Sequence, residues 1–337
     1  MDLNAVKLAA REKLKGTCRV CPVCNGLACA GEIPGMGGRG TGATFRSNIA
    51  SLAACRLNLR VVHAVTRPKL ACRLLGLDLA LPVLGAPIAG VGRNLNNALT
   101  EREYCDAVVT GCLLAGTVAM TGDGSFPEQF ASGLAALKAA NGRAIPVIKP
   151  REPARVVEMA SCAAAAGAPA FGMDIDAAGF LDMADAGQPV GPKTQAELAE
   201  IKAKTAIPFI VKGIMSPGDA AACAAAGVDA IVVSNHGGRA LDHLPGTAEV
   251  LPDIAAAAGE KMAVLVDGGI RSGNDVLKML ALGADAVLVG RPLAIAAVGG
   301  GAEGVAQMLQ KMAGELRAAM VLTGTADVAA VADGIIC

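Results

Sequence analysis

A histidine and an arginine lie three residues apart in the stretch VVSNHGGRALDH, at the end of an apolar run. His236 is one of only three histidines in the chain, and an imidazole can take a proton from a substrate near neutral pH. Arg239 can hold a carboxylate through two hydrogen bonds, and Gly237 allows close approach of the backbone. The stretch predicts proton abstraction from a small carboxylate, with Asp176 orienting the imidazole, although a single histidine at a strand end is more often structural.

Two later stretches combine glycines with an arginine directly after an apolar run. VDGGIRSG places Asp267, Gly268 and Gly269 before Arg271, and VGRP places Gly290 before Arg291. Free backbone N–H groups, a following helix N-terminus and two guanidinium groups suit a phosphate dianion. The alternative is that both stretches are ordinary tight turns whose arginines are solvated. Taken together, the two stretches favour phosphate.

Composition bounds the class of protein. The 337 residues are 53% hydrophobic, with 30 Lys plus Arg against 30 Asp plus Glu. This balance gives no electrostatic footprint for nucleic acid or an anionic membrane, and no apolar run is long enough for a membrane span. The charged N-terminus is not a secretory signal. Eleven cysteines in a long chain of this kind indicate a reducing cytoplasm rather than a disulfide framework.

Short apolar runs alternate with helical segments from about residue 82, which predicts a (β/α)8 barrel. We expect strands at 82–89, 112–120, 145–149, 170–176, 208–213, 230–235, 263–269 and 286–290. We expect helices near 100–111, 127–140, 152–166, 194–205, 217–226, 247–258, 273–282 and 302–322. An open doubly wound sheet is the runner-up, but the GxGxxG fingerprint is absent.

The domain boundaries follow from this alternation. Residues 82–325 form the barrel, and residues 326–337 form a C-terminal tail. Residues 1–81 are an extension that packs on the barrel, with an N-terminal helix, a cysteine segment, a helix near 45–56 and a strand near 57–62. The loop at 177–193 is too long for an ordinary turn, so we expect it over the active-site face. Chemistry in such barrels sits at the C-terminal strand ends.

Several segments resemble the FMN-dependent α-hydroxy-acid oxidase and dehydrogenase family. These are SNHGGR with DHLPGTAEVLPDI, VDGGIRSGNDVLKMLALGADAVLVGRP, PFIVKGIMSPGDA, LPVLGAPIAG and GTGATFRSNIASLAACRLNLRVV. The resemblance implies that His236 is the catalytic base, Asp176 its partner, and Arg239 the holder of the substrate carboxylate. It implies that Lys212 stabilises the anionic reduced flavin. The other cofactor-binding residues that it implies are Pro87, Ile88, Ala89, Ser234, Gly237, Asp267, Gly268, Gly269, Arg271, Gly290 and Arg291.

The chain departs from this family in its substrate pocket. The third strand reads IPVIKP where the family carries Gln and Tyr, and EIPGMGG replaces the segment with the family's N-terminal tyrosine. A second substrate arginine, expected soon after Asp176, is missing. We therefore expect a rebuilt pocket in which Lys149, Asp174 and Asp123 join Arg239 as substrate groups.

Four cysteines crowd into CRVCPVCNGLAC, which is not a feature of that family. Cys18, Cys21, Cys24 and Cys29 have a spacing that suits an iron–sulfur cluster or a structural zinc. The alternatives are free packing cysteines, or a single thiol, Cys29, that reaches the pocket.

The sequence leaves three functions open. The first is an FMN-dependent oxidoreductase acting on a small 2-hydroxy acid such as L-lactate, with an electron acceptor that the sequence does not identify. The second is an FMN-dependent isomerase resembling type 2 isopentenyl-diphosphate isomerase, and the third is a flavin protein without hydroxy-acid turnover. The family resemblance also implies a homo-oligomer, commonly a tetramer.

Overall fold

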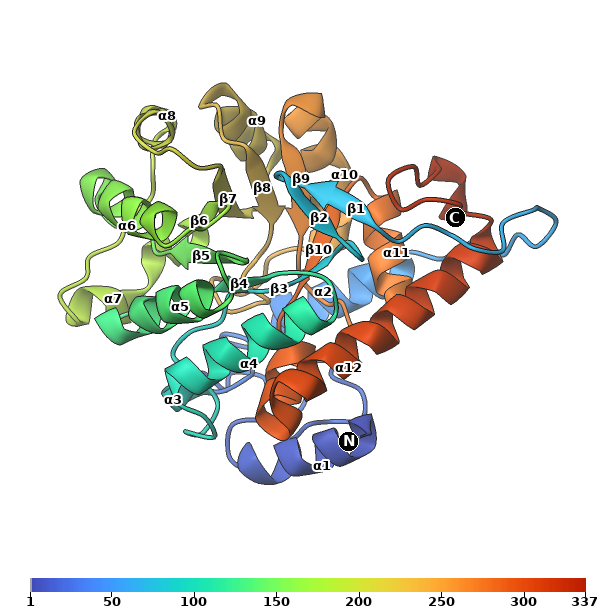
Figure 1. Cartoon of the computed structure of the whole chain (residues 1–337), viewed down its shortest axis with the longest axis horizontal. Helices are drawn as coiled ribbons and strands as arrows, with labels where there is room; N and C mark the ends of the chain where they lie inside the picture. Colours follow the sequence, from blue (N-terminus) through green and yellow to red (C-terminus); the bar gives the residue numbers. More distant parts are fainter. Residues whose placement is uncertain (1) are drawn as a thin grey trace.

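Eight parallel strands close into a barrel in a computed structural model, which describes residues 2–337 (Figure 1). The order around the barrel is β10-β3-β4-β5-β6-β7-β8-β9. The bounds are β3 (Val83–Gly85), β4 (Ala119–Thr121), β5 (Ala144–Ile148), β6 (Phe171–Asp174), β7 (Phe209–Ile214), β8 (Ala230–Val233), β9 (Ala263–Val266) and β10 (Ala286–Val289). The predicted (β/α)8 barrel is confirmed.

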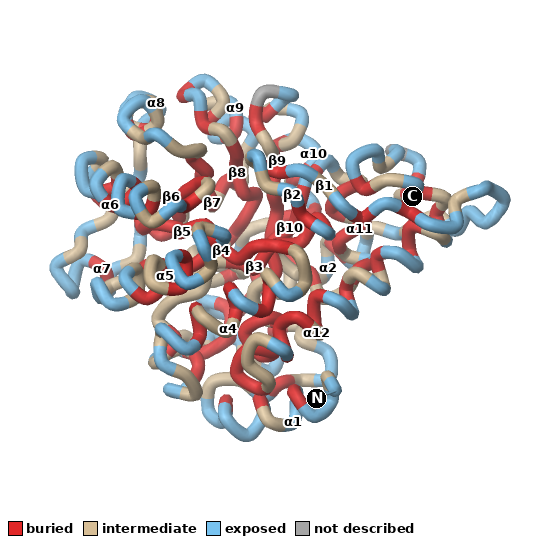
Figure 2. Tube along the Cα trace, viewed as in Figure 1, coloured by how far each residue is buried: buried red, intermediate tan, exposed pale blue. Residues whose placement is uncertain are grey.

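The strands are apolar on both faces because both faces are buried. Leu84, Ile145, Ile210 and Leu265 belong to the cluster that fills the barrel interior. A second cluster packs between the strands and the helices. Figure 2 shows the strands buried throughout, while the outer helices expose one side to solvent. This packing fixes where the C-terminal ends of the strands lie.

The outer helices follow their strands in chain order. Their bounds are α4 (Glu101–Leu114), α5 (Pro127–Ala139), α6 (Pro153–Ala165), α8 (Gln195–Ala203), α9 (Pro217–Ala225), α10 (Thr247–Ala258), α11 (Gly273–Ala281) and α12 (Arg291–Thr323). Thr100, Ser216 and Ser272 each accept a hydrogen bond from a backbone N–H in the first turn of a helix. These caps satisfy donors that would otherwise lack a partner.

Short elements interrupt the regular alternation, and all of them except η2 lie near the site. They are α3 (Val91–Asn94), η1 (Ile175–Gly179), α7 (Leu181–Asp185) and η2 (Gly259–Lys261). The loop 177–193 therefore contains helical turns, and its residues 179–183 line the main cavity, as expected for a segment over the active-site face.

Three predicted elements need correction. The strand expected at 112–120 begins only at Ala119, because residues 112–114 complete α4. No strand forms at 57–62: Leu57 makes one isolated bridge to Ile336, and Val62 is 98% exposed. The strand expected at 170–176 ends at Asp174, because residues 175–179 form η1. The helix expected at 302–322 is confirmed, since Gly301, with φ 59° and ψ −148°, separates it from an additional helical segment that begins at Arg291.

An antiparallel hairpin of β1 (Cys72–Leu74) and β2 (Leu77–Leu79) precedes the barrel and was not predicted. Leu74 and Leu79 join the interior cluster. Because β2 ends just before β3 begins, these side chains close the N-terminal end of the barrel, opposite the predicted chemistry.

The N-terminal extension packs on the barrel helices. Helix α1 (Leu3–Lys13) lies against α12 (Figure 1), where a Cβ on Gly299 would lie 2.0 Å from the carbonyl oxygen of Val6. Helix α2 (Ala43–Ala54) carries Asn48, whose buried amide exchanges two hydrogen bonds with Asn235 after β8, at 2.8 and 2.9 Å. The last short element is η3 (Asp333–Ile335). The extension thus reaches the strand end that carries His236.

Candidate active site

A cavity of about 580 Å³ opens at the C-terminal ends of the barrel strands. Most of the predicted site residues line it. They are Pro87, Ile88, Ala89, Asp123, Lys149, Asp174, Lys212, His236, Gly237, Arg239, Asp267, Gly268, Gly269, Arg271, Gly290 and Arg291. The lining holds seven Lys and Arg residues against four Asp residues, so the cavity favours an anionic ligand.

Two predicted residues stand behind the cavity rather than in its wall. Ser234 is fully buried, and its hydroxyl accepts a hydrogen bond from the backbone N–H of His236 at 3.1 Å. Asp176 contacts the Nδ1 atom of His236 and does not line the cavity itself. Ser234 thus supports the backbone at His236, and its place near the cofactor stays a prediction.

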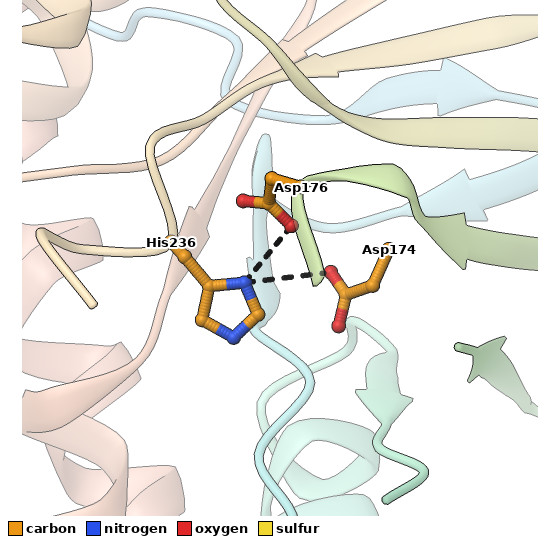
Figure 3. Close-up of side chains that lie close together, drawn as sticks. All are labelled: Asp174, Asp176 and His236. Carbon is orange, nitrogen blue, oxygen red and sulfur yellow. Dashed lines mark hydrogen bonds and ion pairs between the residues drawn. The ribbon is translucent and has the colours of Figure 1, made fainter. Parts of the chain in front are cut away.

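His236 and Asp176 meet across the top of the barrel (Figure 3). The imidazole Nδ1 lies 3.0 Å from Asp176 Oδ1 and 3.9 Å from Asp174 Oδ1. With Nδ1–H donating to Asp176, Nε2 is left as the acceptor, and in Figure 3 it points away from both carboxylates. His236 has φ 57°, an uncommon backbone conformation for a residue other than glycine. The arrangement orients one ring nitrogen to take a proton.

Asp174 is the centre of a buried charge network. Its carboxylate lies 2.8 Å from Lys149 Nζ and 3.0 Å from Lys212 Nζ, and all three side chains are less than 10% exposed. Burial opposes the charge on Asp174, but Lys149, Lys212 and His236 outweigh it and hold the pKa below its usual range. Burial likewise opposes the charge on Lys212, and the neighbouring aspartates raise its pKa. The network therefore places two lysine side chains against one buried carboxylate at the cavity wall.

Replacing Asp174 by asparagine is expected to lower the free energy of unfolding by about 3–5 kcal/mol at pH 7, because two buried ammonium groups lose their counter-charge. The pKa of Asp174 is lower in the folded protein than the value of 3.8 in the unfolded chain. The charged carboxylate therefore stabilises the fold above that pH, and this contribution is lost as the pH falls below it. The difference from wild type should therefore shrink below about pH 4. Denaturant unfolding at several pH values measures it.

The control for this substitution is Asp106→Asn. Asp106 pairs with Arg102 on the exposed face of α4, so its loss should cost about 0–1 kcal/mol. An Asp174→Asn variant as stable as this control at pH 7 would contradict the network.

Asp123 is held by a residue that sequence reasoning missed. Arg151, at the start of the segment after β5, donates to both Asp123 oxygens, and the backbone N–H of Lys149 donates to Oδ2 at 2.9 Å. Both side chains of the Arg151–Asp123 pair are almost completely buried. Asp123 thus fixes the end of β5 and positions Lys149, a role that the sequence spacing alone does not reveal.

Phe180 and Asn94 are two further residues that the sequence did not single out. Phe180 packs edge-on against His236, with ring centroids 5.3 Å apart, and Lys149 Nζ lies 5.3 Å from the same ring. Asn94 accepts a hydrogen bond from Arg239 at 2.8 Å. The signal for Phe180 was available: it is one of six phenylalanines, in the loop already expected over the active-site face.

Arg239 is fixed by the N-terminal extension. Its Nη1 donates to the carbonyl oxygens of Gly35 and Gly37, at 2.6 and 3.2 Å. Burial, with Arg39 nearby, lowers the pKa of Arg239 to about 10, so it stays charged at neutral pH. A guanidinium has five N–H groups. The remaining ones leave Arg239 able to bind a carboxylate in the cavity.

Arg271 and Arg291 lie together at one end of the cavity, beside Gly268 and Gly269, and both contact the Phe45 ring. Arg291 donates to the carbonyl oxygens of Met36, Gly237 and Gly37 and stacks 3.9 Å over the Phe45 ring. Arg271 has a buried Nε without a hydrogen-bond partner. Among the ion pairs of residues 2–337, none contains either arginine. Two half-buried guanidinium groups without a carboxylate partner favour an anionic ligand.

The four clustered cysteines lie beside this end of the cavity. Cys18, Cys21, Cys24 and Cys29 line a small second cavity together with Met36 and Arg291, and all eleven cysteines of the chain are free thiols. Burial raises the pKa of Cys18 and of Cys29, although Arg291 opposes the rise at Cys29. The chain thus gathers four unpaired thiols next to two arginines.

The chain belongs to the FMN-dependent dehydrogenase family, whose model matches residues 35–184 and 181–337. It is 50% identical over 129 residues to an L-lactate dehydrogenase of Caulobacter vibrioides, covering 38% of this chain and 34% of that one. It is 44% identical over 141 residues to an L-lactate oxidase of Lactobacillus jensenii, covering 42% and 34%. In both comparisons the chain spans about a third of the relative's length.

The fold comparison extends over nearly the whole chain. A crystal structure of mandelate oxidase with (S)-2-phenylpropionate superposes with a TM-score of 0.79 and 31% identity, covering 99% of this chain and 97% of that one. A structure of mandelate oxidase with 3,3-difluoro-2-hydroxy-3-phenylpropionic acid gives a TM-score of 0.77 and 32% identity, covering 97% and 96%. The resemblance noted in the sequence is therefore confirmed.

FMN is the cofactor that this family implies, and the residues present fit it. The unpaired Nε of Arg271 and the cationic end of the cavity suit the phosphate. Gly268 and Gly269 have φ 101° and 81°, and a Cβ on Gly268 would lie 2.6 Å from Thr247 Oγ1, so this turn requires glycine. Pro87, Ile88 and Ala89 form an apolar part of the cavity wall.

Proposed function

We propose that this protein is an FMN-dependent oxidoreductase that oxidises the hydroxyl-bearing carbon of a small 2-hydroxy acid such as L-lactate. The observation that carries the proposal is the His236–Asp176 pair, which orients a free imidazole nitrogen into a cationic cavity. The relatives named above are hydroxy-acid oxidases and dehydrogenases, so the isomerase alternative is not favoured.

Each residue is assigned a role that its surroundings support. His236 Nε2 takes a proton from the substrate, and Asp176 stabilises the resulting imidazolium. Arg239 binds the substrate carboxylate, and Lys149 supplies a second cation for it. FMN, when bound, supplies the two-electron acceptor. Lys212 opposes the negative charge that the transferred electrons bring.

The ribityl and phosphate groups are proposed to bind at the turns after β9 and β10. The residues are Asp267, Gly268, Gly269, Arg271, Gly290 and Arg291. Burial raises the pKa of Asp267, although Lys212 opposes the rise. The carboxyl oxygens of Asp267 can accept a hydrogen bond from a ribityl hydroxyl. Gly237 and the segment 87–89 complete the wall around the ring.

The decisive experiment is anaerobic titration of the FMN-loaded protein with L-lactate, glycolate, mandelate and isopentenyl diphosphate. Bleaching of the flavin absorbance by at least one hydroxy acid is the expected result. Bleaching by none, with a response to isopentenyl diphosphate, would overturn the proposal in favour of an isomerase. Readmitting oxygen or adding a dye then identifies the class of electron acceptor.

The location and assembly of the protein are proposed separately. No helix among the described residues is long and apolar enough to cross a membrane. Eleven free thiols support a reducing cytoplasm. We also propose a homo-oligomer, commonly a tetramer in this family; the exposed Leu59, Val61 and Val62 support an apolar contact surface, which light scattering would measure.

A further inference from the structure

We propose that Cys18, Cys21, Cys24 and Cys29 bind a [4Fe–4S] cluster beside the phosphate end of the cofactor cavity. The four cysteines line one small cavity, although they lie on an irregular segment with no helix or strand to position them. All four are free thiols. Four thiolates are the ligand set of such clusters, and C-x2-C-x2-C is the spacing of the bacterial cluster-binding run.

Contacts within the N-terminal extension fix the shape of the segment that carries the cysteines. The backbone N–H of Cys18 donates to Leu14 in the turn that follows α1, and the N–H of Met36 donates to Thr17. A Cβ on Gly37 would lie 2.1 Å from the carbonyl oxygen of Cys29. These contacts give the loop a defined shape, as a site with four ligands requires.

The sulfur atoms also have the polar surroundings that a cluster needs. Val20 has φ 45°, and its backbone N–H donates to Cys18 Sγ at 3.4 Å. Hydrogen bonds to the sulfurs tune such clusters. Arg271 Nη2 lies 3.6 Å from Cys24 Sγ, and Arg291 lines the same cavity. The two arginines that lack a carboxylate therefore face cysteine side chains on this side.

The arrangement favours a cluster over a single zinc ion. Tetrahedral zinc with bonds of about 2.3 Å brings its thiolate sulfurs within about 3.8 Å of one another. Among the described residues, Asp174, Asp176 and His236 form the one set of three or more ligand atoms within 4.8 Å of each other. The four sulfurs are therefore spread more widely than one zinc ion allows. A cluster meets this spacing because each thiolate binds a different iron atom.

The position links this site to the cofactor cavity. Met36 and Arg291 line both cavities, so the wall between them is one layer of side chains. A cluster at the four cysteines would therefore lie next to the site proposed for the flavin cofactor. Binding of the cluster does not depend on the proposed hydroxy-acid chemistry, and the two are tested by different measurements.

The test is to purify the full chain without oxygen, reconstitute it with ferrous iron and sulfide, and measure metal and acid-labile sulfide. We expect about four iron and four sulfide per chain, and an electron paramagnetic resonance signal after reduction with dithionite. Stoichiometric zinc without sulfide, or no bound metal after reconstitution, would overturn the proposal even if the flavin responds to hydroxy acids.

Matched variants locate the cluster. Cys21→Ser and Cys24→Ser should lose most of the iron, whereas Cys162→Ser, an exposed cysteine on α6, should retain it. FMN content and melting temperature are recorded for each variant, so that loss of iron is separated from unfolding. Full iron and sulfide in both Cys21→Ser and Cys24→Ser would place the cluster elsewhere and reject this site.

Discussion

Replacing His236 by asparagine is expected to slow FMN reduction by a hydroxy acid by about 10²–10⁴-fold, the usual contribution of a positioned base. The imidazole is held by Asp176 through Nδ1 at 3.0 Å, so only Nε2 is available for the proton. Asparagine tolerates the positive φ of this position better than most residues. The substitution therefore removes the base while the backbone keeps its conformation. Anaerobic rapid mixing measures the rate.

The chain offers a closely matched control for this substitution. His243 also has a positive φ, of 62°, and its side chain is 74% exposed. It forms an ion pair with Asp242 at the protein surface. His243→Asn should reduce FMN at the wild-type rate. Both variants should bind FMN with unchanged stoichiometry. A His236→Asn variant with near wild-type reduction would remove His236 from the catalytic step.

The second large effect is expected from Lys212→Met. The ammonium of Lys212 lies 3.0 Å from Asp174 and 3.7 Å from Asp267, inside the cavity wall. A fixed buried charge stabilises negative charge that develops nearby, and the loss of one such group costs about 10²–10³-fold in rate. FMN reduction should slow by that factor, and the midpoint potential of the bound flavin should become more negative.

Stability must be separated from catalysis in this variant. Methionine leaves Asp174 with Lys149 as its remaining lysine partner, so the free energy of unfolding should also fall by about 3–5 kcal/mol. Lys204→Met is the control, because Lys204 forms an exposed pair with Glu200 at the end of α8. If folded, FMN-loaded Lys212→Met has an unchanged potential and reduction rate, Lys212 does not act on the flavin.

Much of this site could be predicted because its residues follow strands that can be recognised in the sequence as apolar runs. Lys212 lies near the end of β7. His236, Asp267 and Arg291 follow β8, β9 and β10 within one to three residues. Parallel strands in a closed barrel bring their C-terminal ends to one rim. Chain order alone therefore indicated which side chains share a cavity, including the pairing of His236 with Asp176 across 60 residues.

The remaining features depend on contacts that have no local signal. Arg239 is fixed by Gly35 and Asn94, which lie 204 and 145 residues away along the chain. Asp123 pairs with Arg151 rather than facing the cavity freely, and Asp174 joins two lysines from neighbouring strands. Such hydrogen bonds and ion pairs form only after the extension has docked and the barrel has closed.

The sequence by itself determined the barrel and indicated the turns and the histidine that are proposed to bind phosphate and act as the base, because periodicity and strand-end residues are local properties. Only the tertiary structure decided how the charges are distributed: which arginines lack a carboxylate, which lysines are paired, and where the four cysteines lie. The physical reason is that pairing and desolvation depend on the distance between distant segments, which residue spacing does not encode.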